Sequence, residues 1–254
     1  MNAWHNEKLL NGVANGLFVV AGLLAGYFAV LFAAHWPGLP LRVVQVDGVL
    51  AHVTAEQVSD RLEGRVRGNF FGANLGEVRA ALEELPWVRR VEVRRAWPDR
   101  IQVRIEEHVA LARWPDERLV NTFGELFIGS AMPALPLLGG PPGSEREVTE
   151  RYRAFRELLA PIGGDPAAVL MSARQAWQVR VALPERPTLL LDLGRDQPKH
   201  PVNERLARFV AVYPTTVGRL TRSIDYVDLR YPNGFALRVP ELKDDAADPK
   251  RKRT

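Results

Sequence analysis

The sequence predicts an α+β protein with a single N-terminal transmembrane helix, a small β-α-α-β-β module and a mixed β-rich domain with two helices. Three observations predict this class. An uncharged and largely apolar run covers residues 9–34. Alternating apolar and polar residues, typical of half-buried strands, recur through the rest of the chain. Between these strands, four short segments carry apolar residues at helical spacing or begin with helix-capping residues.

The apolar run is long enough to cross a bilayer, because the hydrocarbon core needs about 20 apolar residues in a helix. A cleaved signal peptide would have an apolar region of about 7–15 residues before well-spaced small residues, and this run fits that pattern poorly. We therefore predict a cytoplasmic tail at residues 1–8 and a retained transmembrane helix at 9–36. The charge signal for this orientation is weak, since Lys8 is opposed by Glu7. Trp36 fits an interfacial anchor on the far side.

The composition is that of an ordinary globular protein, with 25% charged and 46% hydrophobic residues among 254. There is no cysteine, which excludes disulfides, thiolate metal sites and a Cys nucleophile. The net charge of +4 is compatible with nucleic acid, but an exported domain meets little of it, so we expect no nucleic-acid partner. Residues 241–254 are predicted to be disordered, because nothing apolar follows Leu242. Their basic run, 250–253, is expected to be solvated.

Residues 41–108 are predicted to form a small module in which two helices lie on one face of a three-stranded sheet. Thr54 and Gln57 form a capping box at the start of the first helix. Asn74, with Glu77 three residues later, begins the second helix. The predicted elements are a strand at 41–46, helices at 54–62 and 74–85, and strands around 91–93 and 101–105.

Residues 109–240 are predicted to form a β-rich domain. Its two helices are expected at 145–160 and 201–213, and a Pro/Gly-rich loop at 133–143. Asn233-Gly234 is a strong hairpin signal between the last two strands. The predicted strands are 111–114, 119–121, 126–128, 169–172, 177–183, 188–193, 224–231 and 235–239.

The sequence carries no recognisable catalytic constellation. Its five histidines are scattered, and none forms a His-Glu-x-x-His zinc motif. Ser144 and Ser172 lack a nucleophile-elbow context, and no phosphate-binding glycine motif is present. We therefore predict no catalytic residue, no metal ligand and no cofactor. A membrane-anchored cell-wall enzyme remains the alternative, although its site would consist wholly of unmarked residues.

The last predicted strand, 235–239, would lie at the edge of its sheet with one side of its backbone unpaired. Exposed edges invite pairing with another chain, and proteins usually cover or charge them. Only Arg238 and Pro240 protect this strand. From these residues alone, a blunted edge and a docking site for an added partner strand are equally compatible with the pattern.

Several short stretches, in this order and spacing, resemble the FtsQ/DivIB family of bacterial cell-division membrane proteins, especially its proteobacterial FtsQ branch. The resemblance extends from the anchor to about residue 240. The stretches are Leu85-Pro86-Trp87-Val88, Val91-Glu92-Val93-Arg94-Arg95-Ala96-Trp97-Pro98-Asp99, Ala112-Arg113-Trp114, Arg205-Leu206-Ala207-Arg208-Phe209-Val210, Tyr213-Pro214 and Val227-Asp228-Leu229-Arg230-Tyr231.

The resemblance implies a POTRA domain at 41–108, followed by the family's β domain. It implies a non-catalytic divisome scaffold that crosses the inner membrane once, with its bulk in the periplasm at the septum. The implied partners are FtsB and FtsL, through which septal peptidoglycan synthesis by FtsW and FtsI is controlled, and FtsK as a contact of the POTRA domain. An outer-membrane assembly or export factor is the third reading. Such factors usually repeat the module and end in a barrel, which this chain does not suggest.

In the family, FtsB adds a strand to the last strand of the β domain. The family's Arg-Tyr pair at the end of the penultimate strand matches Arg230 and Tyr231. Its arginine before a Trp-containing strand matches Arg174. Arg238 and Val239 depart from the family pattern, which has a small residue and an aromatic one at these positions. The other implied partner-binding residues are Asn233, Gly234, Phe235, Ala236, Leu237 and Val239.

Overall fold

The computed structural model describes residues 7–35, 43–48, 50–65, 70, 72–97, 99–130, 132–220 and 224–239. The chain divides into two compact units, Met1–Glu107 and His108–Thr254. The predicted disordered tail and residues 1–6 of the predicted cytoplasmic tail lie outside the described residues.

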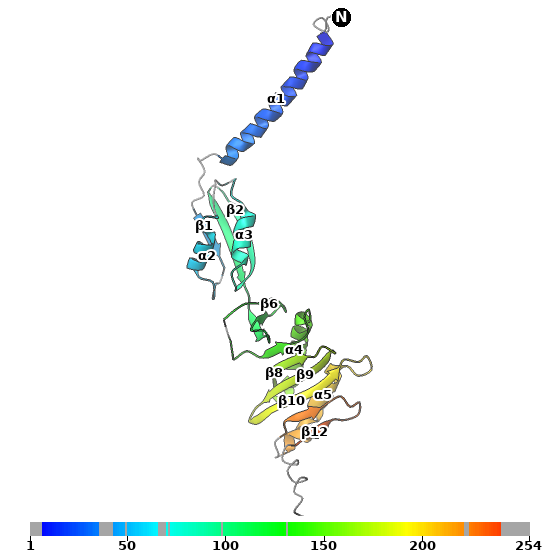
Figure 1. Ribbon diagram of the computed structural model, residues 1–254. Helices are drawn as coiled ribbons and strands as arrows, with labels where there is room; N and C mark the ends of the chain where they lie inside the picture. Colours follow the sequence, from blue (N-terminus) through cyan, green and yellow to red (C-terminus); the bar gives the residue numbers. More distant parts are fainter. Residues whose placement is uncertain are drawn as a thin grey trace, which may run out of the picture. The chain divides into compact units, whose positions relative to one another are not determined.

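The N-terminal helix, α1, covers Glu7–His35, so it begins two residues before the predicted start (Figure 1). Its stretch Asn11–Phe32 is long and apolar enough to cross a membrane, with a mean hydropathy of 2.0. Large apolar side chains of this stretch are exposed rather than packed against other parts of the protein. A long helix with apolar side chains exposed along it is suited to lipid. Trp36 lies outside the described residues.

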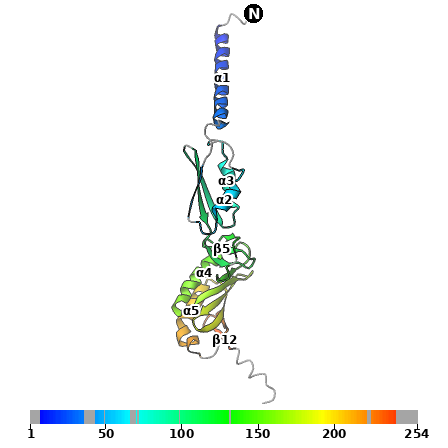
Figure 2. The ribbon, with the colours of Figure 1, turned by 90° about the vertical axis from the view of Figure 1, so that its left-hand side faces the viewer.

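The first globular module has the predicted β-α-α-β-β order. Within the described residues its sheet has the strand order β1-β3-β2, with β1 parallel and β2 antiparallel to β3. Both helices cover the same face of this sheet (Figure 2). Val58, Val78, Leu82, Ile101 and Val103 are buried in this core. The elements are β1 (Val43–Asp47), α2 (Ala55–Leu62), α3 (Leu75–Glu83), β2 (Val88–Ala96) and β3 (Arg100–Glu107).

The predicted helix starts are confirmed by their hydrogen bonds. The Thr54 hydroxyl accepts the Gln57 backbone N–H at 3.2 Å, and the Gln57 side chain accepts that of Thr54 at 3.0 Å. The Asn74 side chain accepts the N–H of Gly76 at 3.0 Å. The prediction that α3 continues to residue 85 was wrong, because the Leu85 N–H turns back to the Leu82 carbonyl. This tighter turn ends the helix before Pro86.

The second unit contains a nine-stranded sheet within the described residues, in the order β12-β11-β10-β9-β8-β7-β4-β5-β6. Two helices, α4 (Glu145–Leu159) and α5 (Val202–Val212), cover one face of the sheet (Figures 1 and 2). Trp177, Phe155, Leu191 and Phe209 are fully buried between these layers. The strands are β4 (Ala110–Arg113), β5 (Leu119–Asn121), β6 (Leu126–Phe127), β7 (Leu137–Gly139), β8 (Asp165–Met171), β9 (Ala176–Leu183), β10 (Arg186–Arg195), β11 (Tyr226–Asp228) and β12 (Ala236–Arg238).

Two sequence predictions in this unit were wrong about strands before α5. The predicted Pro/Gly loop at 133–143 contains β7, which pairs in parallel with β4 and β8. The three residues of β7, Leu137–Gly139, are too few to show an alternation of apolar and polar residues. They form a strand because they pair with neighbouring strands on both sides. The strand predicted at 169–172 begins at Asp165, because its first half pairs with β9.

The penultimate strand is shorter than predicted, since β11 ends at Asp228 instead of residue 231. The Asp228 carboxylate accepts the backbone N–H of Arg230 at 3.0 Å. This side-chain-to-backbone bond, two residues along, is a turn-forming contact that turns the chain out of the sheet. The predicted tight hairpin is therefore a seven-residue connection from Leu229 to Phe235.

Candidate functional site

The strand β12 forms one edge of the nine-stranded sheet, which confirms that the last strand is an edge strand within the described residues. It pairs antiparallel with β11, with Tyr226 opposite Arg238, Val227 opposite Leu237 and Asp228 opposite Ala236. β11 in turn pairs in parallel with β10. The edge strand is short, but its neighbour β11 is hydrogen-bonded to the rest of the sheet.

The hydrogen bonds of β11 decide which backbone groups of β12 point outward. The Leu190 N–H donates to the Asp225 carbonyl at 3.0 Å, and the Leu229 N–H donates to the Asp192 carbonyl at 2.8 Å. The backbone groups of Asp225, Val227 and Leu229 therefore point toward β10. The backbone groups of Tyr226 and Asp228 point toward β12. Their partners Arg238 and Ala236 use their backbone groups toward β11. The N–H and C=O of Leu237, between them, point to the open side of the edge.

The side chains of the edge divide between the two faces of the sheet. Phe235 packs edge-to-face on Phe209 of α5, with ring centroids 5.6 Å apart. Val239 also packs against the core, so these two predicted binding residues anchor the strand in this structure. Leu237 is 37% exposed on the helix-covered face, opposite the buried Val227. Ala236 and Arg238 lie on the open face.

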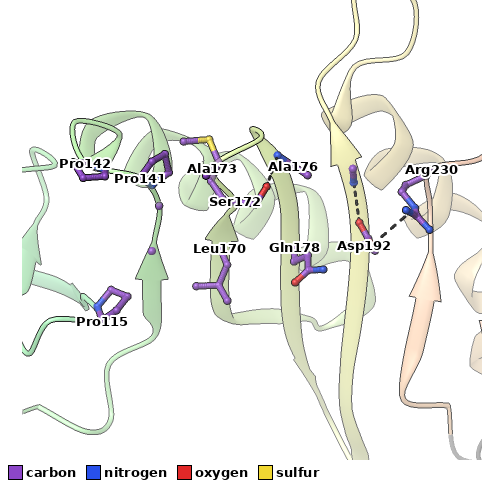
Figure 3. A pocket seen from close by; sticks show the side chains of 14 residues that line it. Pro115, Pro141, Pro142, Leu170, Ser172, Ala173, Ala176, Gln178, Asp192 and Arg230 are labelled. Carbon is purple, nitrogen blue, oxygen red and sulfur yellow. Dashed lines mark hydrogen bonds and ion pairs between the residues drawn. The ribbon is translucent and has the colours of Figure 1, made fainter.

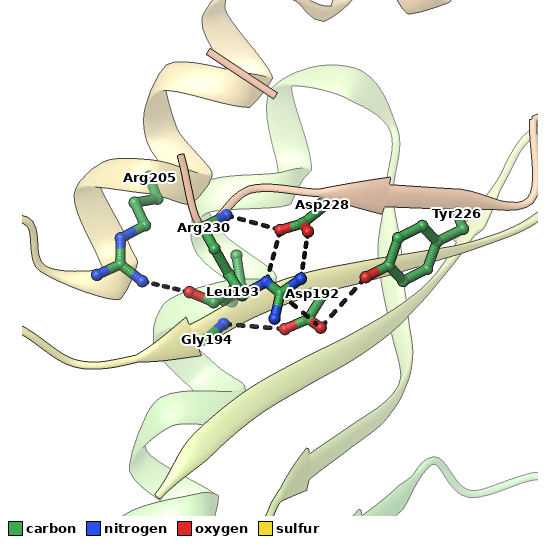
Figure 4. A network of polar contacts seen from close by, with 7 residues as sticks. All are labelled: Asp192, Leu193, Gly194, Arg205, Tyr226, Asp228 and Arg230. Atoms are coloured by element: carbon green, nitrogen blue, oxygen red, sulfur yellow. Dashed lines mark hydrogen bonds and ion pairs between the residues drawn. The ribbon is translucent and has the colours of Figure 1, made fainter. Parts of the chain in front are cut away.

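Arg230 lies in the connection after β11, where its guanidinium binds the Asp228 carboxylate through two bonds (Figure 4). The distances are 2.8 Å from Nε and 2.5 Å from Nη2. Asp192 of β10 lies 3.9 Å from Nε and also accepts the Tyr226 hydroxyl at 3.2 Å. The hydrogen bonds from Arg230 lower the pKa of Asp228, and the same pairing raises the pKa of Arg230. Arg230 therefore remains a cation, and its side chain is still 57% exposed.

The connection between β11 and β12 is further held by α5 and by a glycine. Arg208 of α5 donates to the Pro232 carbonyl. The buried Arg205 donates to the Leu193 carbonyl beside Asp192. Gly194 has φ +66°, and a Cβ at this position would lie 2.8 Å from Cγ of Arg230. A glycine is thus needed both for the backbone conformation and for the passage of the arginine stem.

An open groove of about 730 Å³ runs along this end of the sheet and is bounded on one side by Arg230 (Figure 3). Leu170, Gln178 and Asp192 form its floor and are register partners on β8, β9 and β10. Arg174 lies exposed in the β8–β9 turn, directly after Ala173, which also lines the groove. The register thus brings Arg174 and Arg230 to the same end of the sheet.

The remaining predicted residues lie in the connection before β12. Tyr231 is 55% exposed, so its ring is accessible to a partner. Asn233 and Gly234 are exposed as well. The sequence prediction missed Asp192, Asp228, Gly194 and Arg208 as parts of this site. A carboxylate at Asp192, inside the apolar run 189–193, was the one available signal, because a charged group within an apolar strand needs a partner.

The fold defines a class of protein in which one apolar N-terminal helix precedes a POTRA domain and a β-rich domain. Residues 39–108 match the family model for the POTRA domain of FtsQ type. Residues 112–230 match the model for the C-terminal part of the cell division protein FtsQ/DivIB. The second match ends at Arg230, so what is said of β12 rests on the structure.

Similar proteins along almost the whole chain carry the name cell division protein FtsQ. The protein from Nitrosospira multiformis is 41% identical over 240 residues, which cover 92% of this chain and 98% of the relative. The one from Burkholderia pseudomallei is 37% identical over 243 residues, covering 94% and 96%. The one from Bordetella pertussis is 34% identical, covering 96% of each. This chain belongs to the FtsQ family of cell division proteins.

Proposed function

We propose that this FtsQ-family chain is a non-catalytic, single-pass scaffold of the divisome that binds a partner strand at β12. Its N-terminus lies in the cytoplasm, and both globular domains lie in the periplasm at the division septum. One observation carries the proposal: the N–H and C=O of Leu237 point to the open side of the sheet edge. A partner segment in extended conformation forms its ladder bonds with these groups, as in other cases of strand addition.

Side chains beside the edge supply specificity for an acidic partner segment. Arg230 is held by Asp228 yet exposed, so its remaining N–H groups are free to donate to a partner carboxylate. Arg174 adds a second cation at the same end of the sheet. Tyr231 supplies a rigid aromatic surface, a residue type enriched among the main contributors to binding energy. Leu237 contributes its outward backbone N–H and C=O, and Asn233, Gly234 and Ala236 add exposed surface beside it.

The partner of this edge is FtsB, with FtsL bound alongside it. Through this complex the chain connects to septal peptidoglycan synthesis by FtsW and FtsI, while its POTRA domain contacts FtsK. These partners come from the family resemblance. The charge of Arg174 and Arg230 supports an acidic ligand at this edge but does not choose among division proteins.

The decisive experiment measures binding of the full chain, in lipid nanodiscs, to a periplasmic fragment of FtsB. We expect Tyr231→Ala to raise the Kd by more than about tenfold, or about 1.4 kcal/mol. Phe123→Ala is the matched control, because Phe123 is an equally exposed aromatic residue, 55%, in a turn of the same domain.

Equal effects of the two substitutions would contradict the proposed site while leaving the scaffold role intact. Failure of the unaltered chain to bind the fragment would contradict FtsB as the partner.

A further inference from the structure

The turn between β2 and β3 presents an aromatic side chain that the proposed docking edge does not use. Trp97 is 81% exposed. Among the tryptophans whose burial the structure describes, the other three are buried: Trp87, Trp114 and Trp177. Leaving an indole in water forgoes a large burial of apolar surface, so Trp97 is a candidate for contact with something outside the chain, to be weighed with its neighbours and its place in the module.

The sheet register places this turn at the end of the module where the chain arrives from α1. β1 runs parallel to β3, and Val43, the first residue of β1, lies opposite Arg100, the first residue of β3. Seven residues, 36–42, separate Val43 from the end of α1. Even fully extended, this connection spans at most about 28 Å. The end of the sheet that carries Trp97 is therefore tethered close to the membrane-spanning helix.

Two arginines flank the indole. Arg94 of β2 and Arg100 of β3 lie next to the turn, and both side chains are mostly exposed. Within the described residues, Arg94 pairs with the exposed Glu92 at 3.0 Å, and Arg100 lies 3.8 Å from the partly exposed Asp99. Such exposed pairs contribute little and exchange readily for other anions. An exposed indole beside exposed guanidinium groups matches the interface of a bilayer, where tryptophan settles at headgroup level and cations meet phosphates.

We infer that the β2–β3 turn contacts the surface of the membrane that α1 crosses, with Trp97 in the interface and Arg94 and Arg100 on anionic headgroups. This contact is a second, short-range attachment of the POTRA domain to the bilayer. It restricts how the domain tilts on its tether and so fixes which face it presents to partners. The inference is independent of the β12 docking site, which lies in the other unit of the chain.

The absence of cysteine allows a direct test on the full chain. An Asp99→Cys variant carries an NBD fluorophore in the turn and is reconstituted into phosphatidylcholine–phosphatidylglycerol vesicles that contain doxyl-labelled lipid. The matched control carries the same label at Glu84→Cys. Glu84 precedes β2 whereas Trp97 follows it, so the two labels are separated by the nine-residue strand, about 30 Å.

We expect doxyl lipid to quench the label at position 99 and not the label at position 84. Adding Trp97→Ser should abolish this quenching while circular dichroism stays unchanged. Equal quenching at positions 99 and 84, or quenching that survives Trp97→Ser, would overturn the inference. So would a turn that stays unquenched in vesicles and becomes shielded only when other division proteins are added, which would make it a protein-docking site. Replacing all phosphatidylglycerol with phosphatidylcholine should weaken the quenching, and no change would refute the role of the arginines.

Discussion

At the scale of single residues, carboxylates fix the loops of this protein. Asp228 holds Arg230 in place and ends β11, whereas Glu107 performs a similar task in the POTRA domain. The Glu107 carboxylate accepts the backbone N–H groups of Ala51, His52 and Val53 at 2.8 to 3.2 Å. It thereby ties the segment before α2 to the end of β3. Beside it, the His52 ring stacks on Trp87 with centroids 3.6 Å apart.

Glu107→Gln should loosen the segment before α2. Burial raises the pKa of Glu107, but the N–H donors of Val53, Ala51 and His52 outweigh it, so the net shift is downward. The carboxylate form is thus bound more favourably in the folded state. We expect the neutral amide to lower the free energy of local opening by about 1–2 kcal/mol at neutral pH. Hydrogen exchange of residues 50–54 measures this effect.

The pH dependence follows from the lowered pKa. The contribution of Glu107 is fully present above the pKa that glutamate has in the unfolded chain, and it is lost as the pH falls through the lower folded-state pKa. Protection of residues 50–54, corrected for intrinsic exchange, should therefore fall on acidification in the unaltered protein and change less in Glu107→Gln. Glu106→Gln is the control, since that side chain is 48% exposed and pairs with Arg89. An equal loss in both variants would refute this role.

At the scale of elements, the property that matters most is which way β12 turns its backbone. Because backbone groups alternate along a strand, those of Ala236 and Arg238 point toward β11, and those of Leu237 point to the open side of the edge. Phe235 and Val239 fix the strand on α5 and the core, so the edge is presented by a rigid support. The edge is also kept short, which limits unwanted pairing with other chains.

Two proline substitutions in β12 should separate docking from folding. Leu237→Pro removes an outward N–H, so we expect FtsB binding to weaken by at least about tenfold. The free energy of unfolding should change by only about 0.5 kcal/mol, because proline is tolerated where the N–H of an edge strand faces solvent. Ala236→Pro removes a bond to β11 instead and should destabilise this domain by about 1–3 kcal/mol.

Binding is measured by titration in nanodiscs and stability by urea unfolding. Unchanged binding by Leu237→Pro would contradict strand addition at this edge. Equal destabilisation by the two prolines would contradict the assignment of inner and outer backbone groups.

At the scale of the whole molecule, the protein consists of one long apolar helix and two globular parts, each with its own core. α1 exposes apolar side chains over a stretch long and apolar enough to cross a membrane, whereas the two globular parts bury their own cores. The proposed orientation puts the N-terminal tail, predicted at residues 1–8, on the cytoplasmic side and both cores in the periplasm.

Single cysteines in the cysteine-free chain test the orientation. We expect Ile128→Cys, at an exposed position of the β domain, to react with a membrane-impermeant maleimide in spheroplasts. Asn2→Cys should react only after the membrane is permeabilised. The reverse pattern would overturn the periplasmic placement, and reaction of both residues before permeabilisation would indicate that α1 does not form a stable span.

The sequence by itself determined the long apolar helix, the order of elements in the first module and the helix starts at Thr54 and Asn74. These features depend on contacts within a few residues: apolar length, alternation and side-chain caps. It also indicated the edge strand through the Asn233-Gly234 turn signal, and the arginines beside it through the family resemblance. Only the tertiary structure decided that residues 137–139 form a strand, that β11 ends at Asp228 and that Phe235 faces the core. Each of these depends on partners distant in the sequence, such as β8 for β7 and Phe209 for Phe235. The outward direction of Leu237 likewise follows from the pairing of β11 with β10, which no local pattern contains.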